Sequence, residues 1–370
     1  MAEQSCDWAD WLTLGGVPGL GPVLCRRLLE QFGHPRAILT ADLPALCAVP
    51  GVSPALAQAL RAGSGKNLDA EVAQLQKAGL TLVPWTDPTY PRGLRVIPDP
   101  PPFLYVRGAL MPEDWRAVAM VGSREASSYG LAAAERLAAE LALRGITVVS
   151  GLARGIDAAA HRGALAVGGR TLAVLGCGLD RVYPAAHQDL AEAVRAQGAL
   201  LGEFPPGTPP LPEHFPVRNR LISGLALGVI VVEAAERSGS LITARAALDQ
   251  GREVFAVPGP ITSATSHGTH WLLKQGAKLV EGVTDILEEL TGVLGELPAP
   301  REDGRAEPGE AGGTPAEGAV LAVLGTDPTP IDLIVRGSGL SPAVASGALL
   351  QLELKGRVRQ LSGKRFLKVA

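Results

Sequence analysis

The sequence contains few of the residues that build metal sites, disulfide frameworks or membrane spans. Its four cysteines form no CxxC pair and its six histidines show no ligand spacing, so we expect neither a metal site nor disulfides. No apolar run reaches the roughly 18 residues of a membrane span. The first ten residues carry acids where a signal peptide needs bases followed by an apolar stretch. The sequence therefore predicts a soluble, cytoplasmic protein without a membrane partner.

Lysine is also scarce. Only seven of the 34 basic residues are lysines, and none lies between Lys77 and Lys274. The net charge of −3 argues against a general coat for nucleic acid. Six acids against two bases occur over 292–318, whereas seven bases against three acids occur over 319–370. A phosphate site in the middle of the chain must therefore be a local patch of arginines and backbone N–H groups.

Two common nucleotide-binding motifs are missing, since the chain has neither GxGxxG nor GxxxxGK[ST]. This disfavours a conventional dinucleotide or P-loop site, and we expect no cofactor. What the chain does have, from about 115 to 290, is a regular alternation of apolar strands with helices: AVAMVG, ITVVSG, TLAVLG, ALLGEF, GVIVVEA, EVFAVPG and AKLVEG. The pattern predicts a doubly wound α/β domain, mostly parallel, with ligands at the carboxyl ends of its strands.

Both ends of the chain differ from this middle. Residues 16–33 and 48–63 share Val-Pro-Gly, an apolar residue, Gly or Ser, and Pro before an amphipathic helix, which is the helix-hairpin-helix pattern. Such hairpins bind phosphates or simply pack against protein, and both interpretations stay open. After the linker-like 292–318, three helices and a basic hairpin have a winged-helix layout. The third helix offers only Lys355, so a protein-contact module is at least as good an interpretation as DNA reading.

Two glycine-rich loops follow the first two strands. In VGSREASSYG, Gly122 permits close backbone approach and Ser123 and Arg124 can bind an anion; the alternative is a tight turn with a surface arginine. In SGLARGIDAAAHRGAL, residues 150–165, a catalytic triad of serine, aspartate and histidine is disfavoured because no strained G-x-S-x-G elbow is present. We expect the helix start to face an anion. The residues concerned are Gly151, Arg154, Gly155 and Asp157, with Asp157 capping or buttressing the loop.

Two later segments are also suited to phosphate. HFPVRNRLISGLA places Arg218, Asn219 and Arg220 behind Phe215, which supplies charge for a backbone and a ring for a base; a helix cap with a packed ring is the alternative. In EAAERSGSLITARAAL, Ser238, Gly239, Ser240 and Thr243 surround a helix start, where they either bind an anion or serve as ordinary caps. Four such loops at one sheet edge imply a groove longer than one nucleotide needs.

Taken in order, VGSR, SGLARGIDAAAHRGAL, AVLGCGLDRVYP, HFPVRNRLISGL and AERSGSLITARAALDQGREVFAVPG resemble the DNA-processing protein A family (DprA, also called Smf). The resemblance implies a helix-hairpin-helix (SAM-like) domain over 1–85 and an extended Rossmann-like DNA-binding domain over 86–291. A disordered linker over 292–318 and a winged-helix domain over 319–370 complete the expected organisation.

The resemblance also implies a function. Family members act in natural transformation, where they bind and protect incoming single-stranded DNA, form homodimers and help load RecA. Carried over, it places the arginine of the GSR motif at Arg124, the stacking ring at Phe215 beside His214, and a dimer contact within 268–280, at His270, Leu273 and Leu279. Ala185 stands where many relatives have lysine after the Tyr-Pro pair.

Two alternatives remain open. The same sheet resembles nucleotide phosphoribohydrolases, but their PGGxGTxxE run is absent, and only Glu233 and 238–240 stand in the corresponding region. A structural adaptor that works through its end domains is the other. We expect a binding protein rather than an enzyme, with no catalytic residue.

Overall fold

The computed structural model describes residues 2–63, 68–295, 314–325, 327–354, 357–361 and 363–368. They belong to two compact units, 1–302 and 303–370. A nine-stranded sheet with the order β1-β2-β6-β5-β4-β3-β7-β8-β9 is the centre of the first unit. Its strands are β1 (Thr81–Pro84), β2 (Phe103–Gly108), β3 (Ala117–Val121), β4 (Thr147–Ser150), β5 (Thr171–Val174), β6 (Ala199–Gly202), β7 (Gly228–Val231), β8 (Glu253–Ala256) and β9 (Lys278–Leu279).

Seven of these strands, β3 to β9, run parallel, which confirms the predicted doubly wound α/β fold. The sequence did not predict β1 and β2, which extend the sheet beyond β6 as two antiparallel strands. Strand β1 lies before residue 85, so the sheet begins within the segment expected to be helical. The proline-rich 98–103 leads directly into β2.

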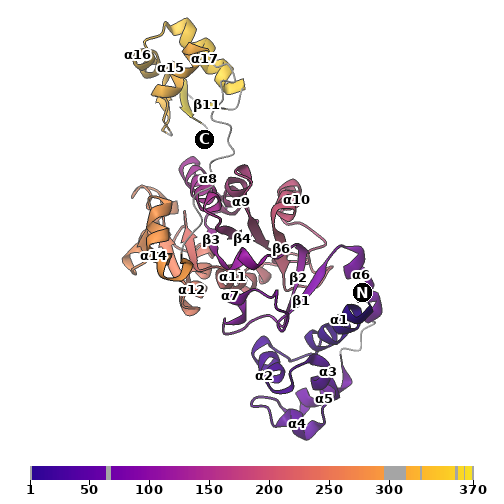
Figure 1. Cartoon of the computed structure of the whole chain (residues 1–370). Helices are drawn as coiled ribbons and strands as arrows, with labels where there is room; N and C mark the ends of the chain where they lie inside the picture. Colours follow the sequence, from indigo (N-terminus) through magenta and orange to yellow (C-terminus); the bar gives the residue numbers. More distant parts are fainter. Residues whose placement is uncertain are drawn as a thin grey trace. The chain divides into compact units, whose positions relative to one another are not determined.

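Helices cover both faces of the sheet (Figure 1). On one face Val118 and Met120 pack against α8 (Ser128–Leu143), α9 (Ile156–Ala166) and α14 (Val283–Leu294). On the other face Ala119 and Val121 contact the core of α7 (Arg92–Arg95), α11 (His214–Leu225), α12 (Gly239–Asp249) and α13 (His267–Lys274). Successive residues of a strand point to opposite faces, which is why a doubly covered strand is apolar throughout. Helix α10 (Gln188–Gln197) covers β5 and β6, and the 3-10 helices are η1 (Pro112–Trp115), η2 (Ala185–His187) and η3 (Ala264–Ser266).

The N-terminal helices share a hydrophobic core with the end of this sheet. The ring of Trp11 lies edge-on to Phe103 of β2, with centroids 6.5 Å apart, and Phe103 is edge-on to Tyr105 at 5.5 Å. The helical region is therefore anchored to β2. It comprises α1 (Ala2–Gly15), α2 (Pro22–Phe32), α3 (Pro35–Thr40), α4 (Leu43–Cys47), α5 (Pro54–Ala62) and α6 (Leu68–Lys77).

The second unit has the predicted winged-helix fold. Helices α15 (Pro315–Val323), α16 (Ile331–Ser338) and α17 (Pro342–Leu354) pack around Ile334 and Leu349, and a three-stranded sheet joins β10 (Thr329–Pro330), β12 (Arg365–Lys368) and β11 (Val358–Leu361). Lys355 and the 296–313 part of the expected linker lie outside the described residues. Within the described ranges, no single helix could span a membrane; only α16 and α17 taken together, bent by 109°, have the length and composition.

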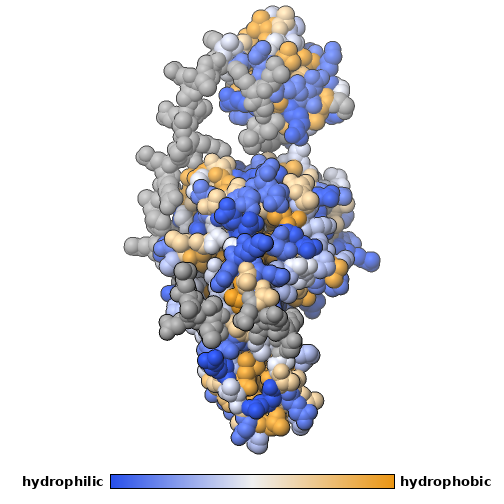
Figure 2. Space-filling model, turned by 90° about the vertical axis from the view of Figure 1, so that its right-hand side faces the viewer, coloured by the Kyte–Doolittle hydropathy of each residue, from blue (hydrophilic) through white to orange (hydrophobic). Residues whose placement is uncertain are grey.

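The surface of the described residues is chemically mixed. Figure 2 shows one face on which hydrophilic residues predominate and hydrophobic residues form small groups. The large exposed apolar side chains include Ile261, Trp271 and Leu279, which follow β8 or lie near the β9 edge of the sheet.

Candidate nucleic-acid interface

The carboxyl ends of the parallel strands meet at one edge of the sheet. From β3 the chain moves outward through β4, β5 and β6, and then returns to the other side of β3 with β7, β8 and β9. The topological switch point therefore lies between β3 and β7, where doubly wound sheets bind their ligands. The loops after β3, β4 and β7, together with the start of α11 after β6, are the segments that the sequence predicted to carry the site.

The loops after β3 and β4 are joined by their backbones. The N–H of Ile156 donates to the carbonyl oxygen of Ser123 at 3.1 Å. Gly155, with φ +73°, makes this approach possible, since a Cβ there would lie 2.2 Å from the same oxygen. The Ser123 hydroxyl accepts the Glu125 N–H at 3.1 Å. Both loops are thus held in place beside the start of α9, and Gly122 is half-buried beneath them.

Asp157 buttresses the second loop, as predicted from the sequence. Its carboxylate accepts the N–H groups of Gly151 at 3.1 Å and Ala153 at 3.3 Å. The side chain is only 7% exposed, and burial raises its pKa while the guanidinium of Arg218 opposes that rise. Asp157 therefore organises the loop from inside.

Arg218 occupies a different place from the one expected of a phosphate ligand. It is 4% exposed, and its Nη1 donates to the carbonyl oxygens of Gly151, at 2.8 Å, and Val174. A Cβ on Gly151 would lie 2.7 Å from Arg218 Nη2, so the contact depends on that glycine. Arg218 thus ties α11 to the ends of β4 and β5 and does not present its guanidinium to solvent.

Phe215 lies at the centre of a cluster above Arg218. The guanidinium carbon of Arg124 lies 5.4 Å from its ring centroid and that of Arg218 lies 5.9 Å away. The ring of Tyr183 approaches to 5.6 Å with a tilt of 40°. Contacts of this kind between cations and rings are attractive. Phe215 is therefore half-buried between two cations and a second ring.

Arg124 and Arg154 are exposed at this edge, as are Arg181 in the loop after β5 and Arg237 in the loop after β7. Neither Arg124 nor Arg154 has a carboxylate partner among the described residues, so both are available to an anion. Arg220, in contrast, is 13% exposed and forms ion pairs with Glu203 at 2.5 Å and Asp99 at 3.1 Å. Within the run at 218–220, Arg218 is therefore buried and Arg220 is paired with carboxylates.

The neighbours of these residues are also engaged. Asn219 Nδ2 donates to the carbonyl oxygen of Gly239 at 3.4 Å. His214 stacks on Phe204 with centroids 4.3 Å apart, and its Nδ1 lies 3.2 Å from the Pro209 carbonyl oxygen. Both residues are half-buried.

The loop after β7 behaves mainly as a helix cap. The Ser238 hydroxyl accepts the N–H of Ser240 at the start of α12, and Ser240 and Thr243 are buried, whereas Gly239 is exposed. Glu233, the residue that corresponds to a catalytic glutamate in the enzyme alternative, is 4% exposed and accepts hydrogen bonds from the Ser127 backbone and hydroxyl. Its carboxylate holds Ser127, the N-cap residue of α8, and so joins the β3 and β7 loops.

The sequence reasoning missed Tyr183 as a residue of this edge. The Tyr183 side chain is 43% exposed and contacts Phe215. It belongs to the Tyr-Pro pair of the family resemblance, which precedes Ala185, the residue that replaces the lysine of many relatives. Its closeness to Phe215 depends on the fold, because 32 positions separate the two residues.

In the described ranges no group of three His, Cys, Asp or Glu side chains could hold a metal ion.

The predicted dimer contact lies at the opposite end of the sheet from β1. Leu279 of the edge strand β9 is 43% exposed, and Leu273 is half-buried. His270 is half-buried, and its Nε2 lies 3.0 Å from the Gly259 carbonyl oxygen. Trp271, between them on α13, is 53% exposed. An edge strand with exposed apolar side chains is a surface suited to another chain.

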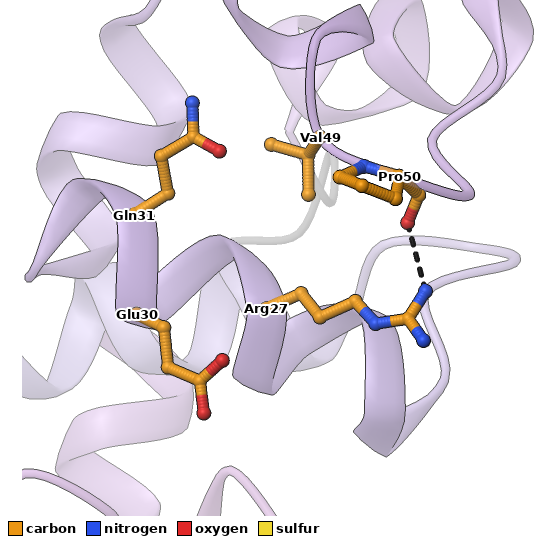
Figure 3. Close-up of a pocket in the computed structure, with 5 residues that line it drawn as sticks. All are labelled: Arg27, Glu30, Gln31, Val49 and Pro50. Atoms are coloured by element: carbon orange, nitrogen blue, oxygen red, sulfur yellow. Dashed lines mark hydrogen bonds between the residues drawn. The ribbon is translucent and has the colours of Figure 1, made fainter.

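The helical hairpins show packing rather than a free phosphate cradle. A shallow pocket of about 500 Å³ lies between α2 and the turn after α4, lined by Arg27, Glu30, Gln31, Val49 and Pro50. Arg27 Nη1 donates to the carbonyl oxygen of Pro50 at 2.9 Å (Figure 3). The cation nearest the second hairpin turn is thus used to join the two hairpins. None of the residues predicted at the sheet edge lines this pocket.

Comparison with known proteins gives consistent assignments along the chain. The family model described as DNA recombination-mediator protein A matches residues 81–291. A DprA winged helix domain matches 304–364, and a SAM-like helix-hairpin-helix tandem matches 12–63. Protein Smf of Escherichia coli is 44% identical over 299 residues, 80% of each chain. Protein Smf of Synechocystis is 36% identical over 392 residues, 97% of this chain and 98% of the other.

Solved structures agree with the fold. The structure of DNA processing protein A from Streptococcus pneumoniae superposes with a TM-score of 0.66 at 38% identity, over 76% of this chain and 97% of that one. A second structure, of DNA processing protein A from Helicobacter pylori, has a TM-score of 0.52 at 28% identity, over 58% of this chain and 96% of that one. The latter is described as showing a single-stranded DNA binding mode.

Proposed function

Because this chain belongs to the DNA recombination-mediator protein A family, whose members are called DprA or Smf, we propose that it binds single-stranded DNA at the carboxyl edge of its sheet. The observation that carries the proposal is the pair of exposed arginines, Arg124 and Arg154, beside the Phe215 cluster. Cations next to aromatic rings are what single-strand binding uses: charge for the phosphates and rings for the bases. The H. pylori relative described as binding single-stranded DNA supports the same ligand.

The proposal divides the predicted residues into two roles. Arg124, Arg154 and the backbone of the two loops would contact phosphates, and Gly122, Ser123 and Gly155 would let the strand approach. Asp157, Arg218, Arg220 and Asn219 would hold the loops and α11 in place, because their side chains already bond to protein. His214, Ser238, Gly239, Ser240 and Thr243 would shape the rim of the groove.

A direct test is fluorescence anisotropy of a labelled poly-dT oligonucleotide with unlabelled competitors at two salt concentrations. We expect binding that weakens with salt, because phosphate contacts release counterions, and that single strands compete away more effectively than duplexes. Absence of binding at low salt would contradict the proposal.

We further propose that the protein acts without catalysis, as a homodimer that protects incoming single-stranded DNA in natural transformation and delivers it to RecA. This finer role rests on the family resemblance. Incubation with nucleoside monophosphates is expected to release no free base, and Glu233 supports this because its carboxylate is occupied by Ser127. Release of base that is lost on Glu233→Gln would favour the phosphoribohydrolase instead.

The RecA step has its own test. Adding the protein to single-stranded DNA coated with a single-strand-binding protein should shorten the lag before RecA filaments form. An unchanged lag with a protein that binds DNA normally would contradict this step alone.

A further inference from the structure

We infer that the ring on which a DNA base stacks at this edge is Tyr183, with Phe215 as its support. This inference rests on the proposed single-strand binding and names the contact that a base makes there. It differs from the sequence-based expectation, which placed the base on Phe215.

The Phe215 ring is already surrounded by other groups. The guanidinium carbons of Arg124 and Arg218 lie 5.4 and 5.9 Å from its centroid, and the centroid of the Tyr183 ring lies 5.6 Å away. The backbone at Gly176 is also close, since a Cβ there would lie 3.1 Å from Phe215 Cδ1. A base needs a ring face free over most of its area. The half-buried Phe215 has neighbours on too many sides to offer one.

The Tyr183 ring, in contrast, is accessible from solvent. Its side chain is 43% exposed, and Phe215 is the one aromatic ring that contacts it among the described residues. Tyrosine gives a large, rigid contact area at small entropic cost, because only two side-chain torsions must be fixed. The exposed phenol therefore offers an aromatic surface to a base arriving from solvent.

The loop that carries Tyr183 is fixed by hydrogen bonds at both of its ends. The Gly178 N–H donates to the Thr208 carbonyl oxygen at 3.0 Å, and the Gly207 N–H donates to the Asp180 carboxylate at 2.8 Å. At the other end, the His187 N–H donates to the Pro184 carbonyl oxygen at 2.9 Å. Because the loop is fixed before binding, little ordering entropy is lost when a base stacks.

The charges around Tyr183 suit a nucleotide. Arg124 lies over the neighbouring ring, and Arg181 is 43% exposed with Asp180 as a partner at a long 3.7 Å. Arginines near an exposed ring supply the two things that single-strand binding uses, charge for the phosphates and a ring for a base. Arg181 also provides positive charge near the position where Ala185 replaces the lysine of many relatives.

The test uses the full chain and an oligo-dT that contains one 2-aminopurine, whose fluorescence is quenched when the base stacks. We expect Tyr183→Leu to abolish the quenching on binding and to raise the Kd roughly tenfold, as expected for one lost stack. Tyr183→Phe should keep both, because the stacking ring remains. Phe215→Leu should weaken binding while part of the quenching persists.

Two outcomes would separate the inference from the proposed function. Wild-type quenching and affinity in Tyr183→Leu would overturn the role of Tyr183 while single-strand binding stands. No binding by the wild-type protein would overturn the proposed function itself. Thermal unfolding of each variant checks the fold, and loss of quenching in Tyr183→Phe as well would overturn stacking as the mechanism.

Discussion

At the residue scale, two buried side chains, His161 and Arg218, join helices next to the site to the sheet. His161 is fully buried on α9, and its Nδ1 lies 2.7 Å from the Thr171 hydroxyl. That hydroxyl donates its own proton to the Val148 carbonyl oxygen, so it accepts from His161 Nδ1–H. Nδ1 therefore carries a proton, and the imidazole is held between α9 and the sheet.

This burial predicts a pH dependence of stability. Burial, followed by the neighbouring His187 and Arg218, lowers the pKa of His161 to about 3 from an ordinary value of 6.5. Between these pH values the unfolded chain binds a proton that the folded protein does not. The free energy of unfolding therefore falls as the pH is lowered from 6.5 towards 3.

The free energy of unfolding of His161→Gln should fall less than that of wild type as the pH is lowered from 6.5 towards 3. Urea unfolding at several pH values measures this. The exposed His267→Gln serves as the control and should keep the wild-type slope. Equal slopes for wild type and His161→Gln would show that His161 does not supply this dependence.

Arg218→Ala should destabilise the fold by about 3–5 kcal/mol, the usual cost of leaving a buried charge uncompensated. It leaves Asp157 buried without its cation and the carbonyl oxygens of Gly151 and Val174 without their donor. Arg162→Ala, an exposed arginine on α9, is the matched control and should change stability by at most about 0.5 kcal/mol. Similar unfolding midpoints for the two variants would contradict the structural role of Arg218.

The difference between Arg218 and its neighbours also shows what the sequence could not predict. The run at 218–220 suggested three solvent-facing groups. One turn of α11 instead points Arg218 at the sheet, and Arg220 pairs with Glu203 and Asp99, which are distant in sequence. The pairing of Tyr183 with Phe215 is hidden for the same reason. Glycines and exposed arginines at strand ends could be predicted, but side-chain partners brought together by the fold could not.

At the scale of elements, the parallel strands were predictable because both of their faces are buried. Each is a continuous apolar run, as in β3 and β7. Strand β2 is equally buried over Phe103–Val106, but it follows a proline-rich stretch, and its partners β1 and β6 pair antiparallel. The local sequence pattern of β2 resembles a connector. Only its pairing with β1 and β6 identifies β1 and β2 as an extension of the sheet.

The edge strand β9 carries a prediction about assembly. Leu279→Glu should convert the proposed homodimer to a monomer, because it places a charge on the exposed apolar side chain of that edge. Sedimentation equilibrium at one protein concentration measures the change. Leu248→Glu, on α12 and 59% exposed, is the control and should keep the wild-type mass. A monomeric wild type would contradict the homodimer, and a dimer that survives Leu279→Glu would place the contact elsewhere.

At the scale of the whole molecule, the organisation agrees with the family. A helical hairpin tandem, a doubly wound sheet and a winged-helix unit follow one another along the chain. The end domains contain several bases, yet Arg27 joins the two hairpins, and the third helix of the winged unit is largely apolar. Single-strand binding is therefore proposed for the sheet edge, where Arg124 and Arg154 are exposed without carboxylate partners among the described residues.

The measurement that tests this assignment most directly is the affinity of Arg124→Ala for oligo-dT as a function of salt. Lys364→Ala, which removes an exposed cation from the hairpin of the winged unit, is the matched comparison. We expect Arg124→Ala to weaken binding more than Lys364→Ala. It should also flatten the dependence of log K on log salt by about 0.7, the value for one lost phosphate contact with a single strand. Binding by Arg124→Ala with the affinity and salt dependence of wild type would contradict the account.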